Sequence, residues 1–324
     1  MEVRKLGDSG LAVSRLCLGT MQFGWTADRA TSLNLLDAAF DAGVNFIDSA
    51  DIYSKWVQGN PGGVAEQIVG EWLMQSPGRR DQIVLATKVR GAMGAGPNAE
   101  GLSRKHIFSA VEASLQRLNS SYIDLYQLHW PDDETPIDET LEALSRLVER
   151  GMVRYIGCSN FPAWRVVEGL FVSEMKRCAR FISVQPHYNL IHREEFEREL
   201  EVVCDKYGLG VMPYSPLARG FLTGKYRAQA PKSRRKGKVP ERIKRYMADP
   251  EKQAVVEAIM GISESTGSTA AQVSLAWLLE KATITSPIIG PRTLDQLHDN
   301  LGALELDLSE QEIEQLDKVS AWAA

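Results

Sequence analysis

The chain of 324 residues is 44% hydrophobic and 24% charged, with a net charge of -5 and a pI near 5.7. These values are typical of a globular protein with a sizeable core, and the length permits either one large (β/α) barrel of about 250 residues or more, or two ordinary domains. The acidic balance gives no global attraction to nucleic acid or to an anionic membrane, so we expect neither as a partner.

The first predicted element is a β-hairpin, in which the runs VRKL and LAVS flank the turn sequence GDSG. After it, eight short apolar runs alternate with amphipathic segments. The predicted strands are 15–20, 45–48, 83–88, 123–130, 153–160, 181–185, 210–216 and 286–290. The predicted helices are 31–42, 64–74, 103–118, 136–150, 162–170, 194–207, 251–260, 269–281 and 293–301. The segment LSEQEIEQLDKV has Ser309 and Glu312 in capping-box spacing and predicts a final docked helix.

The order of these elements predicts the fold class. Continuous apolar runs are typical of parallel strands that helices cover on both faces. Eight strand–helix units favour a closed (β/α)8 barrel over an open doubly wound sheet, which more often has about five or six strands. No low-complexity linker divides the chain. We therefore predict an α/β fold, one (β/α)8 (TIM) barrel domain over residues 1–324 with an N-terminal β-hairpin and a docked C-terminal helix.

Cysteine spacing and the N-terminus bear on the compartment. The four cysteines form no C-x-x-C pair, which argues against a disulfide scaffold or a zinc ribbon. The N-terminus lacks the apolar core of a signal peptide, and no window approaches the roughly 18 unbroken apolar residues of a membrane span. We expect reduced thiols in a cytoplasmic protein.

Polar side chains end three consecutive predicted strands, namely Asp48, Lys88 and His129, and Tyr53 follows in the loop after Asp48. In a (β/α)8 barrel the chemistry takes place at these strand ends, so the four side chains would share one side of the barrel mouth. A phenol has a pKa near 10, which is too high for efficient proton transfer at neutral pH. A neighbouring ammonium lowers that pKa, and a carboxylate paired with the ammonium keeps the latter charged. We predict that Tyr53 is a general acid tuned by Lys88 and Asp48, and that His129 orients a carbonyl or assists the proton transfer.

Other interpretations of these residues stay open at this point. Taken singly, Asp48 fits a helix cap, Lys88 a surface lysine and His129 a core histidine, and only their joint occurrence favours a site. A lysine at a barrel strand end can also form a Schiff base with a carbonyl substrate, as in an aldolase. Asp51 has no matching strand-end position, and we expect it to stabilise its loop.

Two segments resemble the signatures of a known family. GVNFIDSADIY resembles the G-x-x-x-x-D-T-A-x-x-Y motif of the aldo-keto reductases, NADPH-dependent (β/α)8-barrel oxidoreductases, with Ser49 where threonine is usual. GCSNF resembles their G-x-S-N-[FY] segment. The resemblance extends from the hairpin to about residue 308. It implies a catalytic tetrad of Asp48, Tyr53, Lys88 and His129, and no metal.

The resemblance also implies that NADPH or NADP+ is the cofactor. Ser159, Asn160 and Gln185 would hold the nicotinamide carboxamide, and Tyr214 would stack on the ring. Ser215, Leu217 and Arg219 would line the pyrophosphate, and Arg292 would face the 2′-phosphate. The remaining predicted contacts are Gly19, Thr20, Met21, Asp48, Pro216, Gly220, Lys225, Gly290, Thr293, Gln296 and Asn300. No G-x-G-x-x-G is present, so a phosphate site built from barrel loops and a helix N-terminus would take its place.

Loop aromatic residues follow the strands on the same side as the tetrad, and aromatic walls are typical of small-molecule pockets. We predict a substrate pocket formed by Trp25, Trp56 and Trp130; the alternative, which applies equally to Phe23, is that they pack loops against the barrel. The basic run 232–245 is interpreted as a solvated loop, with a flap near the dinucleotide phosphates as the alternative.

The expected reaction is reduction of an aldehyde or ketone to an alcohol, with the proton from Tyr53. The alternatives are a redox-sensing NADPH-binding subunit, such as the potassium-channel β subunits that resemble this family, a Schiff-base lyase acting through Lys88, and a dehydrogenase working in the oxidative direction. The identity of the substrate, and whether the protein is a monomer or a homo-oligomer, stay open.

Overall fold

The computed structural model describes residues 1–227 and 239–322. Eight parallel strands form one sheet, each hydrogen-bonded to the next in the chain, with the last beside the first. They are β3 (Cys17–Gly19), β4 (Phe46–Asp48), β5 (Val84–Val89), β6 (Ile123–Leu128), β7 (Val153–Ser159), β8 (Phe181–Gln185), β9 (Gly210–Val211) and β10 (Ile288–Ile289). The N–H of Ile288 donates to the carbonyl oxygen of Pro213 at 2.8 Å, which joins β10 to the chain just after β9. The predicted (β/α)8 fold is confirmed.

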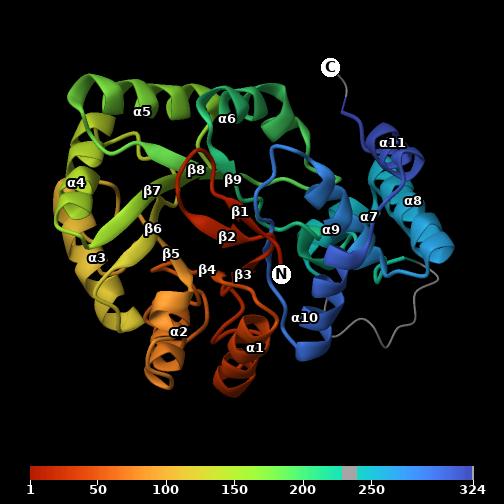
Figure 1. Ribbon diagram of the computed structural model, residues 1–324, viewed down its shortest axis with the longest axis horizontal. Helices are drawn as coiled ribbons and strands as arrows, with labels where there is room; N and C mark the ends of the chain where they lie inside the picture. The colour runs from red at the N-terminus through yellow and green to blue at the C-terminus, as the bar shows by residue number, and fades with distance from the viewer. Residues whose placement is uncertain (228–238, 323–324) are drawn as a thin grey trace.

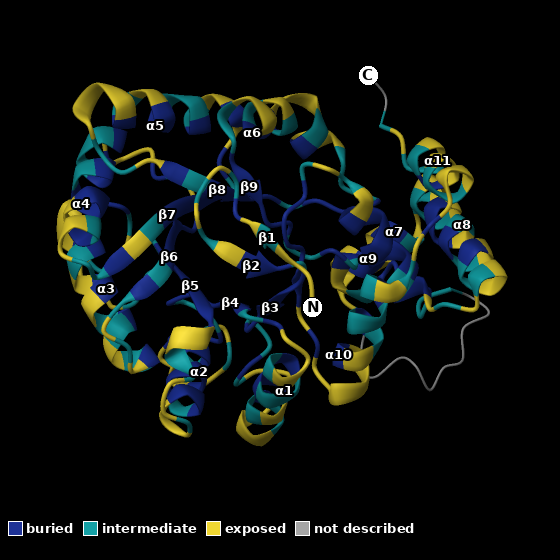
Figure 2. Cartoon of the chain, viewed as in Figure 1, coloured by how far each residue is buried: buried dark blue, intermediate teal, exposed yellow. Residues whose placement is uncertain are grey.

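The helices surround the strands, so the strands are buried while the outer helix faces are exposed (Figures 1 and 2). The helices are α1 (Arg29–Asp41), α2 (Val64–Met74), α3 (Arg104–Leu118), α4 (Ile137–Glu149), α5 (Ala163–Lys176), α6 (Glu201–Tyr207), α7 (Glu241–Met247), α8 (Pro250–Thr266), α9 (Ala270–Glu280), α10 (Leu294–Leu301) and α11 (Glu310–Val319). A short π-helix, Phe196–Leu200, leads into α6. Every predicted strand and helix is present. However, α5 and α8 extend beyond the predicted ends at residues 170 and 260, β9 is shorter than the predicted strand 210–216, and α7 was not predicted.

The N-terminal hairpin seals one end of the barrel. β1 (Val3–Lys5) and β2 (Ala12–Ser14) pair antiparallel, as predicted. Leu6 and Val13 are fully buried, and they pack among residues near the start of the barrel strands, such as Cys17 and Phe46. In Figure 1 the hairpin lies across the strands. Because the hairpin covers the ends where the strands begin, access to the barrel interior is left to the opposite ends, where the strands finish.

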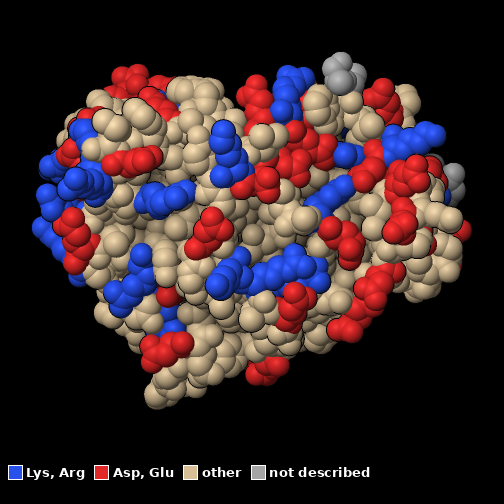
Figure 3. All heavy atoms as spheres, turned by 45° about the horizontal axis from the view of Figure 1, so that its top comes forward, with Lys and Arg blue, Asp and Glu red and all other residues tan. Residues whose placement is uncertain are grey.

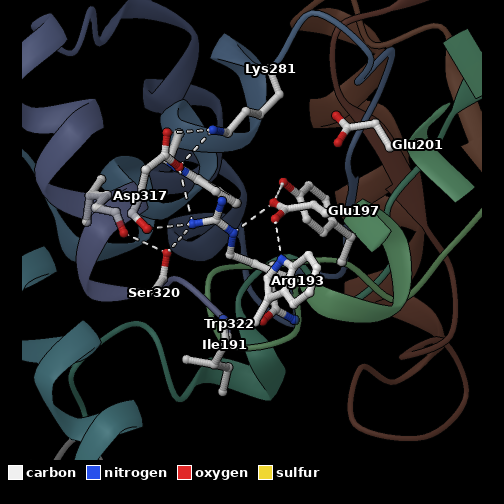
Figure 4. A network of polar contacts seen from close by, with 12 residues as sticks. Ile191, Arg193, Glu197, Glu201, Lys281, Asp317, Ser320 and Trp322 are labelled. Carbon is white, nitrogen blue, oxygen red and sulfur yellow. Dashed lines mark hydrogen bonds and ion pairs between the residues drawn. The ribbon is translucent and has the colours of Figure 1, made fainter. Parts of the chain in front are cut away.

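The C-terminal helix α11 is docked through a polar network (Figure 4). Ser309 caps the helix in the predicted capping box with Glu312. Arg193 donates to the carbonyl oxygen of Asp317 at 2.9 Å and to the Ser320 hydroxyl at 2.7 Å. The indole N–H of Trp277 on α9 donates to the Asp317 carboxylate at 2.9 Å. The helix is therefore tied to two other parts of the outer layer.

Charges of both signs are interspersed on the face that Figure 3 presents. Of the basic run 232–245, residues 232–238 lie outside the described residues, whereas Arg242, Lys244 and Arg245 belong to α7. Within the described ranges, no helix combines the length and the apolar character that crossing a membrane requires.

Candidate active site at the barrel mouth

Lys88 is at the centre of the predicted site. Its side chain is 0% exposed on β5, and its ammonium donates to Asp48 Oδ2 at 2.5 Å and to the Tyr53 hydroxyl at 2.8 Å. A third bond, of 2.9 Å, goes to the carbonyl oxygen of Ser49. These contacts follow from the parallel register, in which Asp48 pairs with Ala86 and Lys88 pairs with Gln127 on the next strand. The structure thus brings three of the four predicted catalytic side chains into direct contact.

His129, the fourth, follows β6 and is buried beside them. Its ring meets the ring of Tyr53 edge-on, with centroids 5.9 Å apart. Burial lowers the pKa of His129 well below its ordinary value, and the charges of Lys88 and Arg90 lower it further. Its buried Nδ1 has no hydrogen-bond partner in the described part of the chain. The imidazole is therefore uncharged near pH 7.

The acid–base properties of Tyr53 differ from the sequence-based expectation. Burial raises the pKa of Tyr53 to about 12; Lys88 lowers the pKa, but burial outweighs it, and the charge of Asp48 raises the pKa as well. The predicted decrease in the pKa of Tyr53 is therefore wrong for the protein without a cofactor, because burial removes water from around the phenol. Burial also lowers the pKa of Lys88, but Asp48 and Tyr53 reverse this and raise it above the ordinary value. Tyr53 is thus protonated and Lys88 charged at neutral pH.

The second oxygen of Asp48 is held by two glutamines. Gln127 and Gln185 donate to Asp48 Oδ1 at 2.9 and 3.1 Å. The Ser159 hydroxyl donates to the carbonyl oxygen of Gln185 at 2.8 Å, so two of the predicted carboxamide ligands lie against the acid–base group. Gln127 was not predicted as a site residue from the sequence. Its signal was a polar residue in an apolar strand, two positions before His129 and so on the same side of the strand.

The predicted nicotinamide contacts also come together. Asn160 has a left-handed backbone with φ 61°, and its amide donates to the carbonyl oxygen of His129 at 2.9 Å. The hydroxyl of Tyr214 donates to the Asn160 side-chain oxygen, also at 2.9 Å. His187 covers one face of Tyr214, with ring centroids 5.1 Å apart and planes 12° apart. A flat ring can therefore stack only on the other face of Tyr214, next to the amide of Asn160.

The segment after β9 suits an anion. Ser215, Ala218, Arg219 and Gly220 all have positive φ, between 46° and 85°. Left-handed residues of this kind turn backbone N–H groups to one side and form concavities that bind anions. A Cβ on Gly220 would collide with the ammonium of Lys225, so the absent side chain leaves room for this cation. The predicted contacts Pro216 and Leu217 belong to the same segment.

A second group of predicted phosphate and adenosine contacts lies at the start of α10. Burial lowers the pKa of Lys225, and the charge of Arg292 lowers it further. The two cations, which come from different loops, therefore act on each other. Thr293 caps α10 by accepting from the N–H of Gln296, while the Gln296 side chain accepts from the N–H of Arg292. A helix N-terminus beside two cations favours phosphate. Gly290 follows β10, and Asn300 is buried on α10.

The end of β3 supplies the remaining predicted contacts, Gly19, Thr20 and Met21. The Thr20 hydroxyl donates to the carbonyl oxygen of Asp48 at 3.1 Å, so this corner adjoins the acid–base group. Taken together, the described donors and the left-handed backbone fit a dinucleotide, from an amide-bearing ring at Asn160 to a phosphate at Arg292.

The three predicted pocket tryptophans form a wall around Tyr53 and His129. Trp25 meets Trp56 edge-on at 5.5 Å, and Trp56 lies 6.3 Å from the Tyr53 ring. Trp130 stacks on His129 with ring centroids 3.7 Å apart. All three are partly exposed, whereas Phe23 is fully buried and packs the loop. The structure thus places an aromatic, solvent-accessible surface next to Tyr53 and His129.

Asp51 does not support its loop by side-chain hydrogen bonds. It is 1% exposed, and neither carboxylate oxygen has a hydrogen-bond partner among the described residues. Burial raises the pKa of Asp51 well above its ordinary value, and the neighbouring Glu66 raises it further. No hydrogen bond of the Asp51 carboxylate within the described residues therefore supports the predicted loop-stabilising role. The backbone N–H of Asp51 does donate to the carbonyl oxygen of Lys88, at 3.3 Å.

Comparisons with known proteins show the family of this chain. A sequence model described as the Aldo/keto reductase family matches residues 15–321. An uncharacterized oxidoreductase of Bacillus subtilis, YrpG, is 39% identical over 98% of this chain and 96% of its own length. The aldo-keto reductase dtxS3 of Metarhizium robertsii is 36% identical over 97% of this chain and 90% of its own length. A probable voltage-gated potassium channel subunit beta of Oryza sativa subsp. japonica is 35% identical over 94% of this chain and 92% of its own length.

Proposed function

The chain belongs to the aldo/keto reductase family of oxidoreductases, and from this premise we propose that it is an NADPH-dependent enzyme that reduces an aldehyde or ketone to an alcohol. The observation that carries the proposal is the buried Lys88 ammonium, bonded at once to Tyr53 and to Asp48. A protonated phenol next to a fixed cation is suited to donate a proton to a carbonyl oxygen.

Each member of the site has a separate task in this mechanism. Bound NADPH would supply a hydride from nicotinamide C4 to the carbonyl carbon. Tyr53 donates its proton to the carbonyl oxygen, and the ammonium of Lys88, 2.8 Å away, stabilises the phenolate that remains. Asp48 keeps Lys88 charged. The uncharged imidazole of His129, which lies edge-on to the Tyr53 ring, orients the carbonyl oxygen. The alcohol then leaves, and Tyr53 regains a proton from solvent.

The preference for NADPH over NADH rests on cations at the adenosine end. Arg292 and Lys225 come from separate loops, and the charge of Arg292 lowers the pKa of Lys225, so both cations act on the same region. A guanidinium and an ammonium at a helix N-terminus suit the 2′-phosphate that distinguishes NADPH. The four cysteines are all free, which supports action in a reducing compartment, the cytoplasm. The proposed partner is a small carbonyl or alcohol, with no nucleic acid and no membrane.

Two rival functions make different use of the same residues. The similarity to a relative named as a potassium channel subunit favours a regulatory protein that binds NADPH and turns it over slowly. A Schiff-base lyase requires a neutral lysine amine, whereas Lys88 is held as an ammonium by Asp48, so the structure argues against it.

A screen of aldehydes, ketones and alcohols with NADPH and NADH, read as the change in nicotinamide absorbance, tests the proposal. We expect consumption of NADPH with at least one carbonyl compound. Tight NADPH binding with no turnover of any compound would support the regulatory function instead. Covalent trapping of substrate on Lys88 by borohydride, independent of NADPH, would support the lyase.

A further inference from the structure

Arg90 lies at the barrel mouth, where the chain leaves β5 two residues beyond Lys88. The pKa of His129 is lowered by burial first, then by Lys88 and by Arg90, so the guanidinium is close to the imidazole. Arg90 also acts on Asp132, in the loop after β6. The guanidinium is therefore near enough to His129 and to Asp132 for its charge to act on both.

This guanidinium forms no salt bridge within the part of the chain that the structure describes, although Asp132 is near enough for its charge to interact. Its buried Nε has no hydrogen-bond partner there. Asp132, the nearby carboxylate, accepts instead from the Leu102 N–H at 2.7 Å and the Thr135 hydroxyl at 2.8 Å. Buried polar groups in native proteins are almost always partnered. An arginine without a partner at the end of a barrel strand therefore calls for an explanation, and an anionic group on a ligand would supply one.

The backbone of Arg90 is strained. Its φ is 127°, a region that side chains with a Cβ rarely adopt and that glycine adopts easily. The backbone is closely packed here, because a Cβ on the next residue, Gly91, would crowd Ile52 in the Tyr53 loop. Strain of this kind persists where the side chain has a task. An arginine kept at a position suited to glycine indicates that its guanidinium is needed.

The cofactor phosphates are not the missing partner. The proposed phosphate cations follow β9 and β10, whereas Arg90 follows β5. In the ring, β5 is separated from β10 by β3 and β4, and from β9 by β6, β7 and β8. Arg90 is thus on the opposite side of the mouth from the phosphate loops, together with the proton donor Tyr53.

We infer that Arg90 is a specificity-determining residue that binds a carboxylate of the substrate, so that the natural substrate is an aldehyde or ketone that also carries a carboxylate. The planar guanidinium matches a carboxylate through two parallel hydrogen bonds. The inference rests on the proposed reductase function and adds the chemical class of the substrate to it.

Matched substrate pairs test this on the full chain with NADPH. Each carboxylate compound is compared with its methyl ester: 4-formylbenzoate, succinate semialdehyde and pyruvate, which differ in the spacing between carbonyl and carboxylate. We expect at least one acid to be preferred over its ester. In Arg90→Gln the kcat/KM for that acid should fall by about 10- to 100-fold, mainly through KM, as expected for loss of a charge-assisted hydrogen bond. The kcat/KM for the ester should fall much less. Arg90→Lys, which keeps a positive charge, should retain part of the kcat/KM for the acid.

Two further variants separate recognition from structure. Arg146→Gln removes an exposed arginine on α4 that pairs with Glu149, and it should leave both substrates unaffected. Arg90→Gly removes the side chain and relieves the strained φ, so it should bind acids as poorly as Arg90→Gln without a lower Tm. A Tm that falls in both Arg90 variants, with acid and ester affected alike, would identify a structural role and overturn the inference.

A binding measurement keeps this test independent of turnover. Benzoate and benzamide are titrated calorimetrically against the wild type and Arg90→Gln, each loaded with NADP+. We expect benzoate to bind the wild type at least tenfold more tightly than the variant, and benzamide to bind both equally. If no carbonyl compound is reduced but this difference is present, the proposed reductase fails while the carboxylate site stands. If compounds are reduced but acids and esters are equivalent in both proteins, the carboxylate site fails alone.

Discussion

Asp51 is a side chain at which burial and charge conflict. Burial and Glu66 raise its pKa well above the ordinary value, against the opposing charges of Arg117 and Lys88. The folded pKa is thus above the unfolded value of about 4, and the stability that Asp51 contributes is lost as pH rises through the folded pKa. Asp51→Asn removes this loss. We expect the Tm of the variant, relative to wild type, to increase by a few degrees between about pH 5 and about pH 8.

Thermal denaturation at several pH values measures this difference. Asp133→Asn is the control, because Asp133 is exposed in the loop after β6 and should give a flat difference. A difference for Asp51→Asn that is independent of pH, or that shrinks as pH rises, would show that the Asp51 carboxylate is accommodated in its charged form.

Tyr214 combines a stacking face with a hydrogen bond, and two substitutions separate them. Tyr214→Phe keeps the ring but loses the bond to Asn160, so NADPH affinity should fall only a few fold, since one neutral hydrogen bond contributes about 0.5–1.5 kcal/mol. Tyr214→Ala also removes the stacking surface and should cost considerably more. Fluorescence titration with NADPH measures both. Equal losses in the two variants would contradict a stacking role for the ring.

Much of the candidate site could be predicted at this level. Asp48, Lys88 and His129 end apolar strands, and their position in a barrel follows from that alone. The pKa of Tyr53 could not be predicted, because its sign depends on how completely the phenol is desolvated by packing. Arg90 was missed for a related reason: its significance lies in an absent partner and a strained φ, and neither is visible in a sequence.

Among the elements, the C-terminal helix α11 is bonded to the rest of the protein mainly through Asp317. Asp317 accepts from Trp277 and from Lys281, the latter at 2.8 Å, and it also lies 3.4 Å from the guanidinium of Arg193. Asp317→Ala leaves these donors without their acceptor, so we expect the Tm to fall by several degrees with no change in kcat. The measurement is thermal denaturation together with NADPH oxidation.

Glu314→Ala on the exposed side of α11 is the matched control and should leave the Tm nearly unchanged. A loss of activity in Asp317→Ala at temperatures where the variant is folded would contradict a purely structural role for the docked helix, and would link α11 to the mouth.

The elements themselves were predicted closely where local patterns decide them. Ser309 and Glu312 fixed the start of α11, and the capping box is present as expected. The end of α5 was missed because Phe171 and Met175, both exposed, break the amphipathic pattern. The helix α7 was missed because its short, mostly charged sequence carries little apolar periodicity, and packing of Ile243 and Tyr246 determines it.

For the whole molecule, the closed ring explains why distant segments share one site. Consecutive strands are neighbours, so residues 48, 88 and 129 meet although tens of residues separate them in the chain. The hairpin blocks the end where the strands begin, and the chemistry is left to the end where they finish. The prediction of a single domain over residues 1–324 stays a prediction, as does the oligomeric state.

The most direct test of the account is the substitution Tyr53→Phe, measured for both turnover and cofactor binding. The variant keeps the ring, and so the contacts with His129 and Trp56, but has no proton to donate. We expect carbonyl-dependent NADPH oxidation to fall by at least about 10²-fold, in the range for loss of a general acid, while NADPH affinity, measured by fluorescence titration, changes little. A variant that kept most of its activity would contradict the assignment of Tyr53 as the proton donor.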